Sequence, residues 1–328
     1  MKSLRTVSIF LLLMLFTISA SAEENSFALG GKTKVSESAF EMDYGTYPSI
    51  DGSTVMLTLA QAFAQHHLGM TEEDAREFVF FNTTPVAHEN LILKRGNPGS
   101  RIPSQVVLMD AEHPVDLFIG TGLSDEEREF ARQNNVELVE VPICRDAFVF
   151  VVHANNPVAS LTLEQIRGIY REEVYDWSDV GGGEERYIFP LSRNANSGSQ
   201  TAMVEMVMQG DSSYVIGNER YMSGEMSWLL QWVGGYDKEV GDNAIGYSFL
   251  YYVKEMADIA NVKVIAVDGV HPTYENIVSG EYPLVATYYA VYRKEDEDGA
   301  AGKFVEWILS QEGRELIEQA GYIPLEQE

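Results

Sequence analysis

The sequence predicts an α/β protein with mostly parallel sheets, and three observations carry this prediction. From residue 47 onward, strand-like apolar runs alternate with helical patterns, which is typical of helices packed on parallel sheets. The 328 residues, 45% of them apolar, can form one large domain or two medium ones, each with its own core. The charged fraction of 22% is ordinary, which argues against wholesale disorder.

Each element is predicted from a local pattern. Apolar residues three and four apart indicate helices, short apolar runs indicate buried strands, and Ser, Thr or Pro indicates where a helix begins. In chain order we predict a helix over Leu57 to Leu68, a strand over Phe78 to Phe81, a helix capped by Thr84, a strand over Val115 to Ile119, a helix opened by the capping box Ser124 to Glu127, a strand over Ala147 to Val152, a helix over Thr162 to Tyr170, a strand over Ile188 to Leu191, a helix starting near Gln200, strands over Val262 to Val267 and Leu284 to Tyr292, and helical structure from Lys303 to Gln319.

The N-terminus predicts export. Lys2 and Arg5 precede a continuous apolar run, and Ala20-Ser21-Ala22 fits a signal-peptide cleavage site. The apolar run is shorter than the roughly 20 residues that a transmembrane helix needs. We therefore expect residues 1–22 to be a cleaved signal peptide, with an uncleaved anchor as the alternative, and residues 23–46 to be an irregular N-terminal arm. The expected location is periplasmic or extracellular.

Composition argues against several classes of function. The formal charge is −27 and no basic run occurs, so we expect no nucleic-acid binding. The single Cys144 allows no intramolecular disulfide and lies in an apolar stretch, where a buried thiol is expected. His66 and His67 are adjacent and do not share a helix face, so we expect no metal site. A secreted phosphoester hydrolase using Ser197 stays an alternative, although its surroundings lack the G-x-S-x-G elbow.

Three predicted helix starts share one design, in which small hydroxyl residues precede the helix. They are Asp51-Gly-Ser-Thr54, Asn82-Thr-Thr84 and Asn196-Ser-Gly-Ser199. A helix N-terminus has unpaired N–H groups and a partial positive charge, which suits an anion. Arg193 lies four residues before Ser197 and can offer a bidentate fork to an oxyanion. Together these turns predict an oxyanion cradle, although each alone is an ordinary helix cap.

Several segments in order resemble the phosphate-binding subunit of bacterial phosphate ABC transporters, a family of type II periplasmic solute-binding proteins. The likeness extends from about Tyr47 to Leu325. The segments that carry it are Asp51 to Thr54, Leu161 to Tyr170, Asp176 to Gly182, Arg193 to Gln200, Ala244 to Ser248, Val267 to Val270 with Pro272, Tyr282-Pro283 and Gly321 to Leu325.

The resemblance implies two α/β lobes with mixed, mostly parallel sheets, joined by two crossover strands. It places residues 47–143 and 266–328 in the first lobe and residues 144–265 in the second. The ligand would bind between the lobes, which close by a hinge. Carried over by position, the ligand-binding residues would be Ser53, Thr54, Thr83 and Thr84 from the first lobe and Arg193, Ser197, Gly198 and Ser199 from the second.

The chain departs from this family at two places. In the middle turn, where the family has a Gly/Ser-rich loop, this chain has Thr83 and Thr84. The second departure is a missing aspartate. The family usually has an aspartate after the strand matching Val115 to Ile119, where its carboxylate accepts a proton from phosphate. Thr121 holds that place here, and Asp116 is predicted to lie at the start of the strand instead. Thr121 is therefore a further candidate for the site, and the choice of phosphate over sulfate is open.

The function predicted from these observations is capture of inorganic phosphate outside the cytoplasm and delivery to the permease of an ABC transporter. We expect a monomer that is not an enzyme and needs no cofactor. The alternatives are binding of another oxyanion, such as sulfate, molybdate or an organic phosphate, and an adhesion or signalling role on the same scaffold.

Overall fold

The computed structural model describes residues 42–97, 113–195, 197–211, 222–223, 225–236 and 238–325. The chain divides into two units, residues 1–38 and 39–328, and every described residue lies in the second unit. The predicted signal peptide and nearly all of the predicted N-terminal arm lie outside the described residues. Of the described helices, none is both long enough and apolar enough to span a bilayer.

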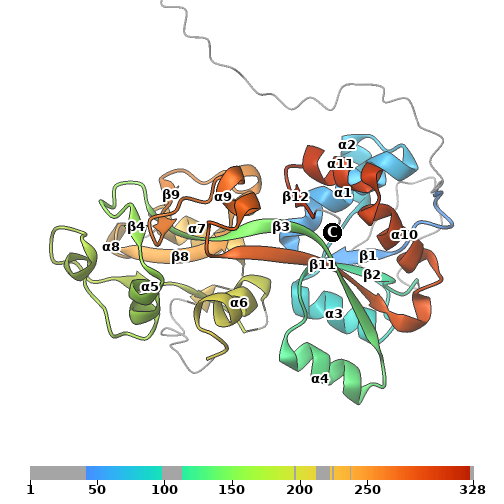
Figure 1. Cartoon of the computed structure of the whole chain (residues 1–328), viewed down its shortest axis with the longest axis horizontal. Helices are drawn as coiled ribbons and strands as arrows, with labels where there is room; N and C mark the ends of the chain where they lie inside the picture. Colours follow the sequence, from blue (N-terminus) through green and yellow to red (C-terminus); the bar gives the residue numbers. More distant parts are fainter. Residues whose placement is uncertain are drawn as a thin grey trace, which may run out of the picture. The chain divides into compact units, whose positions relative to one another are not determined.

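An eight-stranded mixed sheet is the frame of the second unit (Figure 1). Its path is β1-β2-β11-β3-β8-β5, and β9 and β12 also pair with β3. These strands are β1 (Ile50–Gly52), β2 (Leu117–Thr121), β3 (Leu138–His153), β5 (Phe189–Pro190), β8 (Ala244–Phe249), β9 (Val262–Val264), β11 (Val285–Arg293) and β12 (Ile323–Pro324). Two further pairs join β4 (Ser160–Leu161) to β10 (Ala266–Val267) and β6 (Ser192–Arg193) to β7 (Met222–Ser223).

The long strand β3 belongs to two groups of elements. Up to Ala147 it pairs with β11 and β12, and from Phe148 onward it pairs with β8 and β9. We call the elements around the first part the first lobe and those around the second part the second lobe. Figure 1 shows β3 and β11 passing from one group of helices toward the other. The predicted mixed α/β architecture with long crossover strands is therefore confirmed.

The strand pairs are of two kinds, parallel and antiparallel. The pairs β1–β2, β5–β8, β4–β10 and β6–β7 are parallel, whereas every described pairing of β3 and β11 is antiparallel. The sheets are thus more mixed than predicted, because the chain crosses to the second lobe along β3 and returns along β11 in the opposite direction.

The lobe boundaries after residues 143 and 265 stay predictions. β3 changes partners between Ala147 and Phe148, and β10 pairs with β4 in the second lobe. The Tyr282 hydroxyl donates a hydrogen bond to the Phe148 carbonyl at 2.8 Å. These contacts support placing the crossings near residues 147 and 284.

Helices cover both lobes, and two of them begin at the capping boxes or caps predicted from the sequence. The capping box of Ser124 and Glu127 is present, and the Thr162 side chain caps the next helix. The α-helices are α1 (Leu57–Leu68), α2 (Glu72–Phe78), α3 (Thr84–Ile92), α4 (Asp125–Gln133), α5 (Leu163–Tyr170), α6 (Gly198–Ala202), α7 (Met226–Val233), α8 (Lys238–Gly241), α9 (Tyr274–Ser279), α10 (Ala300–Leu309) and α11 (Gln311–Gln319). A 3-10 helix, η1 (Thr54–Met56), leads into α1, and α6 continues as a π-helix, η3 (Met203–Val207).

Two local predictions were wrong. Phe78 ends α2, which Thr71 caps and three acidic residues open, and no strand follows over residues 79–81. A short apolar run cannot by itself distinguish a buried strand from the end of a helix. Thr83, not Thr84, is the N-cap of α3. The helical pattern after Lys303 is two helices, because the Ser310 side chain accepts the Gly313 N–H and starts α11 anew.

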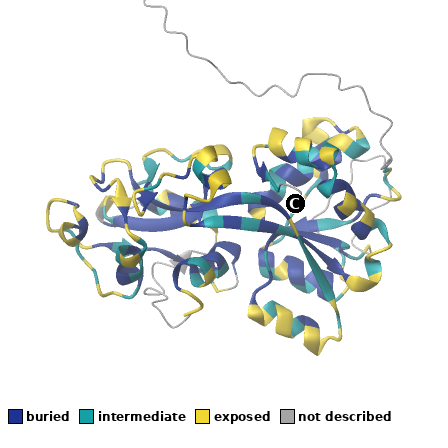
Figure 2. Cartoon of the chain, in the orientation of Figure 1, coloured by how far each residue is buried: buried dark blue, intermediate teal, exposed yellow. Residues whose placement is uncertain are grey.

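Buried residues follow β3 and β11, the strands that pass between the lobes (Figure 2). The part of β3 from Ile143 to Val152 is almost entirely buried. Phe148 contacts Phe150, Tyr247 and Phe249 with ring centroids 5.5–5.8 Å apart. Such aromatic pairs contribute about 0.5–1.5 kcal/mol each beyond the burial of their area. Cys144 is buried in the same strand, as predicted.

Asp146 is a buried carboxylate where β3 passes between the lobes. It accepts hydrogen bonds from the Ala147 N–H at 2.7 Å, from the Tyr251 N–H at 3.3 Å and from the Tyr288 hydroxyl at 3.0 Å. Burial raises the pKa of this carboxyl to about 6, although these bonds and the charge of Lys254 oppose the shift. Asp146 therefore ties β3 to β11 and to the end of β8, at the cost of desolvating its charge.

Asp146 should make the protein less stable as pH rises. The raised pKa means that the folded protein retains this proton over a pH range where the unfolded chain has lost it. The stability is fully present below the unfolded pKa, near 4, and is lost as pH rises through about 6. Between pH 4 and 7, urea unfolding of wild type should lose about 2 kcal/mol relative to Asp146→Asn. Asp298→Asn, at an exposed position, is the control, and parallel curves for wild type and Asp146→Asn would contradict the assignment.

Candidate anion-binding site

Three buried hydroxyls gather at the ends of the first-lobe strands. Ser53 follows β1, and its N–H donates to the Ile119 carbonyl of β2 at 3.0 Å. The Ser53 hydroxyl lies 2.9 Å from the hydroxyl of Thr84, the first residue of α3. Thr121 ends β2 and is also buried. Ser53 therefore joins the β2 end to the start of α3.

Gly120 permits this close approach. A Cβ on Gly120 would overlap the Ser53 hydroxyl. The hydroxyl could then not keep its present position. The small residue lets β1 and β2 bring Ser53 beside the end of β2.

Asp51 positions two of these hydroxyls. One oxygen of its buried carboxylate accepts the Gly52 and Asn82 N–H groups, each at 2.8 Å, and the other accepts the Asn82 side chain at 2.7 Å. Burial raises the pKa of this carboxyl, and the bonds from Asn82 and Gly52 oppose the rise. Since Asn82 lies two residues before Thr84, Asp51 fixes the turn into α3 next to Ser53. In the sequence, Asp51 is part of a predicted turn motif, but no role is predicted for its side chain.

Thr54 and Thr83 are not part of this buried cluster. Both are exposed. Thr54 begins η1, in which Val55 and Met56 occupy the buried positions. Thr83 precedes α3 and makes no side-chain cap bond. Their assignment as ligand-binding residues stays a prediction, and the structure instead groups Ser53 with Thr84.

The second lobe contributes Arg193 at the end of β6. Its side chain is buried, and its Nη1 donates to the Ser199 hydroxyl at 3.3 Å. Burial lowers the pKa of the guanidinium, whereas the nearby Tyr247, Tyr252 and Glu225 oppose that change. Arginine stays charged in proteins, so a full positive charge is held here out of bulk water.

The loop from Arg193 to α6 is held by residues that sequence analysis missed. The Arg193 N–H donates to the Tyr247 hydroxyl at 2.9 Å and to Gln200 Oε1 at 3.2 Å, and Tyr247 also donates to Gln200. Ser197 caps α6 by accepting the Gln200 N–H at 3.3 Å. Tyr247 lies within the recognised segment Ala244 to Ser248, which is the only sequence signal for its role.

The two halves of the candidate site meet at Thr121 and Gly198. A Cβ on Gly198 would lie 2.6 Å from Thr121 Oγ1 and 3.1 Å from its Cγ2, so the Gly198 backbone packs directly on this threonine. Thr121 Oγ1 is buried and has no hydrogen-bond partner among the residues that the structure describes. The structure thus brings Ser53, Thr84 and Thr121 into one region with Arg193 and residues 197–199.

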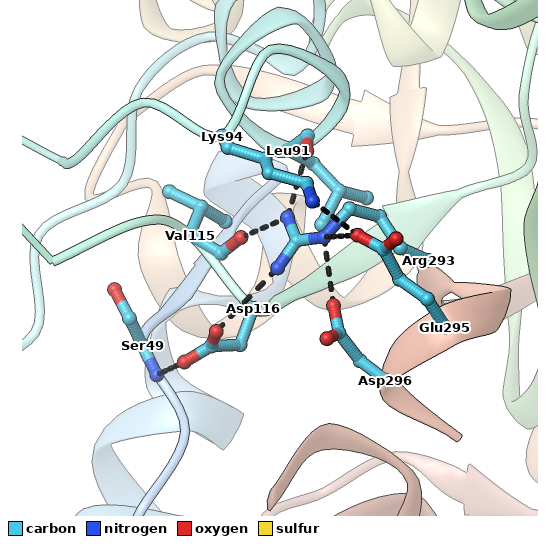
Figure 3. A network of polar contacts seen from close by, with 8 residues as sticks. All are labelled: Ser49, Leu91, Lys94, Val115, Asp116, Arg293, Glu295 and Asp296. Carbon is cyan, nitrogen blue, oxygen red and sulfur yellow. Dashed lines mark hydrogen bonds and ion pairs between the residues drawn. The ribbon is translucent and has the colours of Figure 1, made fainter. Parts of the chain in front are cut away.

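Arg293 holds the scaffold behind α3 (Figure 3). Its Nη1 donates to the Leu91 carbonyl at 2.8 Å and to the Val115 carbonyl at 2.6 Å. Its other nitrogens pair with Asp116 at 3.5 Å and Asp296 at 2.7 Å. Asp116 also accepts the Ser49 N–H at 2.9 Å. Asp116 directly precedes β2, as predicted, and its carboxylate is engaged at the opposite end of that strand from Thr121.

The histidine pair makes other contacts than metal ligation. His66 stacks on Trp307 with centroids 5.2 Å apart and lies 3.4 Å from Glu312. Within the described ranges, no group of three or more His, Cys, Asp or Glu side chains could hold a metal ion.

The fold is that of a two-lobed, type II binding protein, and comparison with known proteins agrees. A family model described as the PBP superfamily domain matches residues 104–312, which is more than half of the chain. The chain belongs to this superfamily.

Phosphate-binding proteins are among the relatives. The chain is 23% identical over 193 residues to the phosphate-binding protein PstS of Borreliella burgdorferi, covering 56% of this chain and 65% of that protein. It is 24% identical over 218 residues to PstS of Pseudomonas aeruginosa, covering 61% and 64%. The chain thus spans slightly less than two thirds of the length of these curated relatives.

Solved structures extend the likeness over most of the chain. A Clostridium perfringens protein named as a substrate-binding protein of a phosphate ABC transporter, with phosphate bound, has a TM-score of 0.60 and 26% identity, covering 85% of this chain and 100% of that one. A phosphate transport receptor from Vibrio cholerae has a TM-score of 0.57 and 21% identity, covering 84% and 99%. The second similarity concerns the fold alone.

Proposed function

We propose that this chain captures inorganic phosphate between its two lobes and delivers it to the permease of an ABC transporter. The observation that carries the proposal is the meeting of Arg193 and residues 197–199 with the buried first-lobe hydroxyls at the Thr121–Gly198 contact. The names of the relatives support phosphate as the ligand. We further propose that the protein acts outside the cytoplasm, as a monomer and without catalysis.

The chemistry of these residues suits an anion. Arg193 supplies a charged, forked donor, and Ser53, Thr84 and Thr121 supply hydroxyls that can rotate toward a ligand. Hydrogen bonds to a charged group contribute about 1.5–3 kcal/mol each, so a few of them give micromolar affinity, which is about −8 kcal/mol. Exposed acidic residues beyond about 8–10 Å are largely screened at physiological salt. The net charge of −27 is therefore compatible with anion binding.

Binding would close the lobes. The first-lobe hydroxyls and Arg193 belong to different lobes, so an anion that contacts both binds the closed form better than the open form. A ligand shifts a conformational equilibrium by its difference in affinity for the two states. In this proposal the Thr121–Gly198 contact would belong to the closed form.

Equilibrium dialysis of residues 23–328 with radiolabelled phosphate tests this function. We expect saturable binding of about one phosphate per chain at micromolar concentration. Absence of saturable binding would overturn the proposal. Hydrolysis of a phosphate ester that disappears in Ser197→Ala would instead favour the hydrolase.

A further inference from the structure

We propose that the site accepts tetrahedral oxyanions whether or not they carry a proton, so that sulfate binds comparably to phosphate. This inference rests on the proposed function and narrows its ligand class. It follows from the kinds of polar group that the site presents and from where the neighbouring carboxylates are engaged.

The groups at the site are a guanidinium, backbone N–H groups and hydroxyls. The guanidinium and the N–H groups can only donate hydrogen bonds. Each hydroxyl has one proton and two lone pairs, so it can donate to an ionised oxygen or accept from a protonated one. A carboxylate would act differently, because it can only accept and would repel an oxygen without a proton.

Two aspartates of the first lobe are engaged elsewhere. Both oxygens of Asp51 accept hydrogen bonds from Gly52 and Asn82. Asp116 binds Ser49 and pairs with Arg293 behind α3.

Three glutamates lie nearer to the lobe contact, and one of them, Glu205 of η3, interacts electrostatically with Arg128 and Glu140 of the first lobe. Glu140 Oε1 accepts the Leu123 N–H at 2.9 Å, and its other oxygen pairs with Arg128. Glu225 interacts electrostatically with Arg193, but it is exposed and accepts the Ser227 hydroxyl at 3.4 Å. Among the described residues, Glu225 is the carboxylate that interacts with Arg193 itself, so the experiment must test its involvement.

Thr121 is the hydroxyl that can serve either kind of anion. It is 7% exposed, and its Oγ1 lacks a hydrogen-bond partner in the described part of the chain. A buried polar atom without a partner costs about 1–3 kcal/mol, which a bound ligand can recover. The same Oγ1 lies at the contact with Gly198, beside the loop from Arg193. By rotating about one bond, this hydroxyl can donate to sulfate or accept the proton of hydrogen phosphate.

Isothermal titration calorimetry with inorganic phosphate and with sulfate tests the inference. For wild type we expect Kd values for the two ions within about tenfold of each other, a difference of at most about 1.4 kcal/mol. Thr121→Asp should create discrimination by weakening sulfate binding at least about 100-fold more than phosphate binding, because juxtaposed like charges cost several kcal/mol. Thr121→Asn, which is similar in size and uncharged, should keep the ratio near that of wild type.

The outcomes separate this inference from the proposed function. Phosphate binding with sulfate more than about 100-fold weaker in wild type would overturn the inference and leave the function standing. Absence of binding by both ions would overturn the function. If wild type discriminates between the two ions and Glu225→Gln does not, Glu225 is the proton acceptor. That result would also overturn the inference. If Thr121→Asp fails to fold, the wild-type ratio and Glu225→Gln decide the matter.

Discussion

Arg193→Ala should weaken phosphate binding by about 10² to 10³-fold while the protein stays folded. Truncating one partner of a buried charged contact costs about 2–5 kcal/mol, and Arg193 is the buried cation of the second-lobe half of the site. The loop itself is held by the Arg193 backbone N–H through Tyr247 and Gln200, and this N–H persists in alanine. The measurement is titration calorimetry together with the thermal unfolding midpoint.

Two further variants separate charge from shape. Arg193→Lys keeps the charge but loses the planar fork, so we expect an intermediate loss of affinity. Arg76→Ala removes an arginine that is 67% exposed, and it should bind like wild type. Full affinity in Arg193→Ala would show that the anion binds elsewhere.

Gly198→Ala should weaken binding about 5- to 150-fold by opposing closure. The added methyl group would lie 2.6 Å from Thr121 Oγ1, and overpacking of this kind costs about 1–3 kcal/mol. Gly198 begins α6, and alanine has a higher helix propensity than glycine, so the second lobe should not be destabilised. Small-angle scattering with phosphate present should show a larger radius of gyration than for wild type.

The partner substitution Thr121→Ala provides the matched test. It removes Oγ1 and Cγ2 and leaves only the Cβ, at an ordinary 3.4 Å from the added methyl group. We expect Gly198→Ala to have little effect in a Thr121→Ala background, so that the two substitutions are strongly non-additive. Additive effects would show that Gly198 acts through something other than this contact.

Local patterns predicted three helix starts. Ser124, Thr162 and Ser197 act as caps, because capping depends on residues only three apart. Arg193 and Ser199 lie close together for the same reason. The sequence predicts Thr54 and Thr83 as ligand-binding residues together with Ser53 and Thr84, because sequence alone does not say which of two adjacent side chains faces inward.

Contacts between distant segments could not be predicted. The Asp51–Asn82 bonds join residues 31 apart, and the Arg193–Tyr247 bond joins residues 54 apart. These partners meet only because α3 packs against β1, and because β5, just before Arg193, pairs with β8. Likewise, the unpartnered hydroxyl of Thr121 and its packing on Gly198 depend on how the two lobes meet. The family resemblance indicates Thr121 as a position at the site, but it does not predict which residues surround this threonine.

The pairing of β3 with β11 sets the order in which the chain can fold. Val285 pairs with Ala147 and Arg293 with Leu138, so the whole second lobe separates the two strands in sequence. A nascent chain cannot complete the β3–β11 pairing of the first lobe until residue 293 is available, although the second lobe's own β3–β8 pairing needs only residue 249. Non-local pairing slows folding because loop-closure entropy is lost before the contacts form. We therefore expect the second lobe to acquire hydrogen-exchange protection before β2 and β11 do.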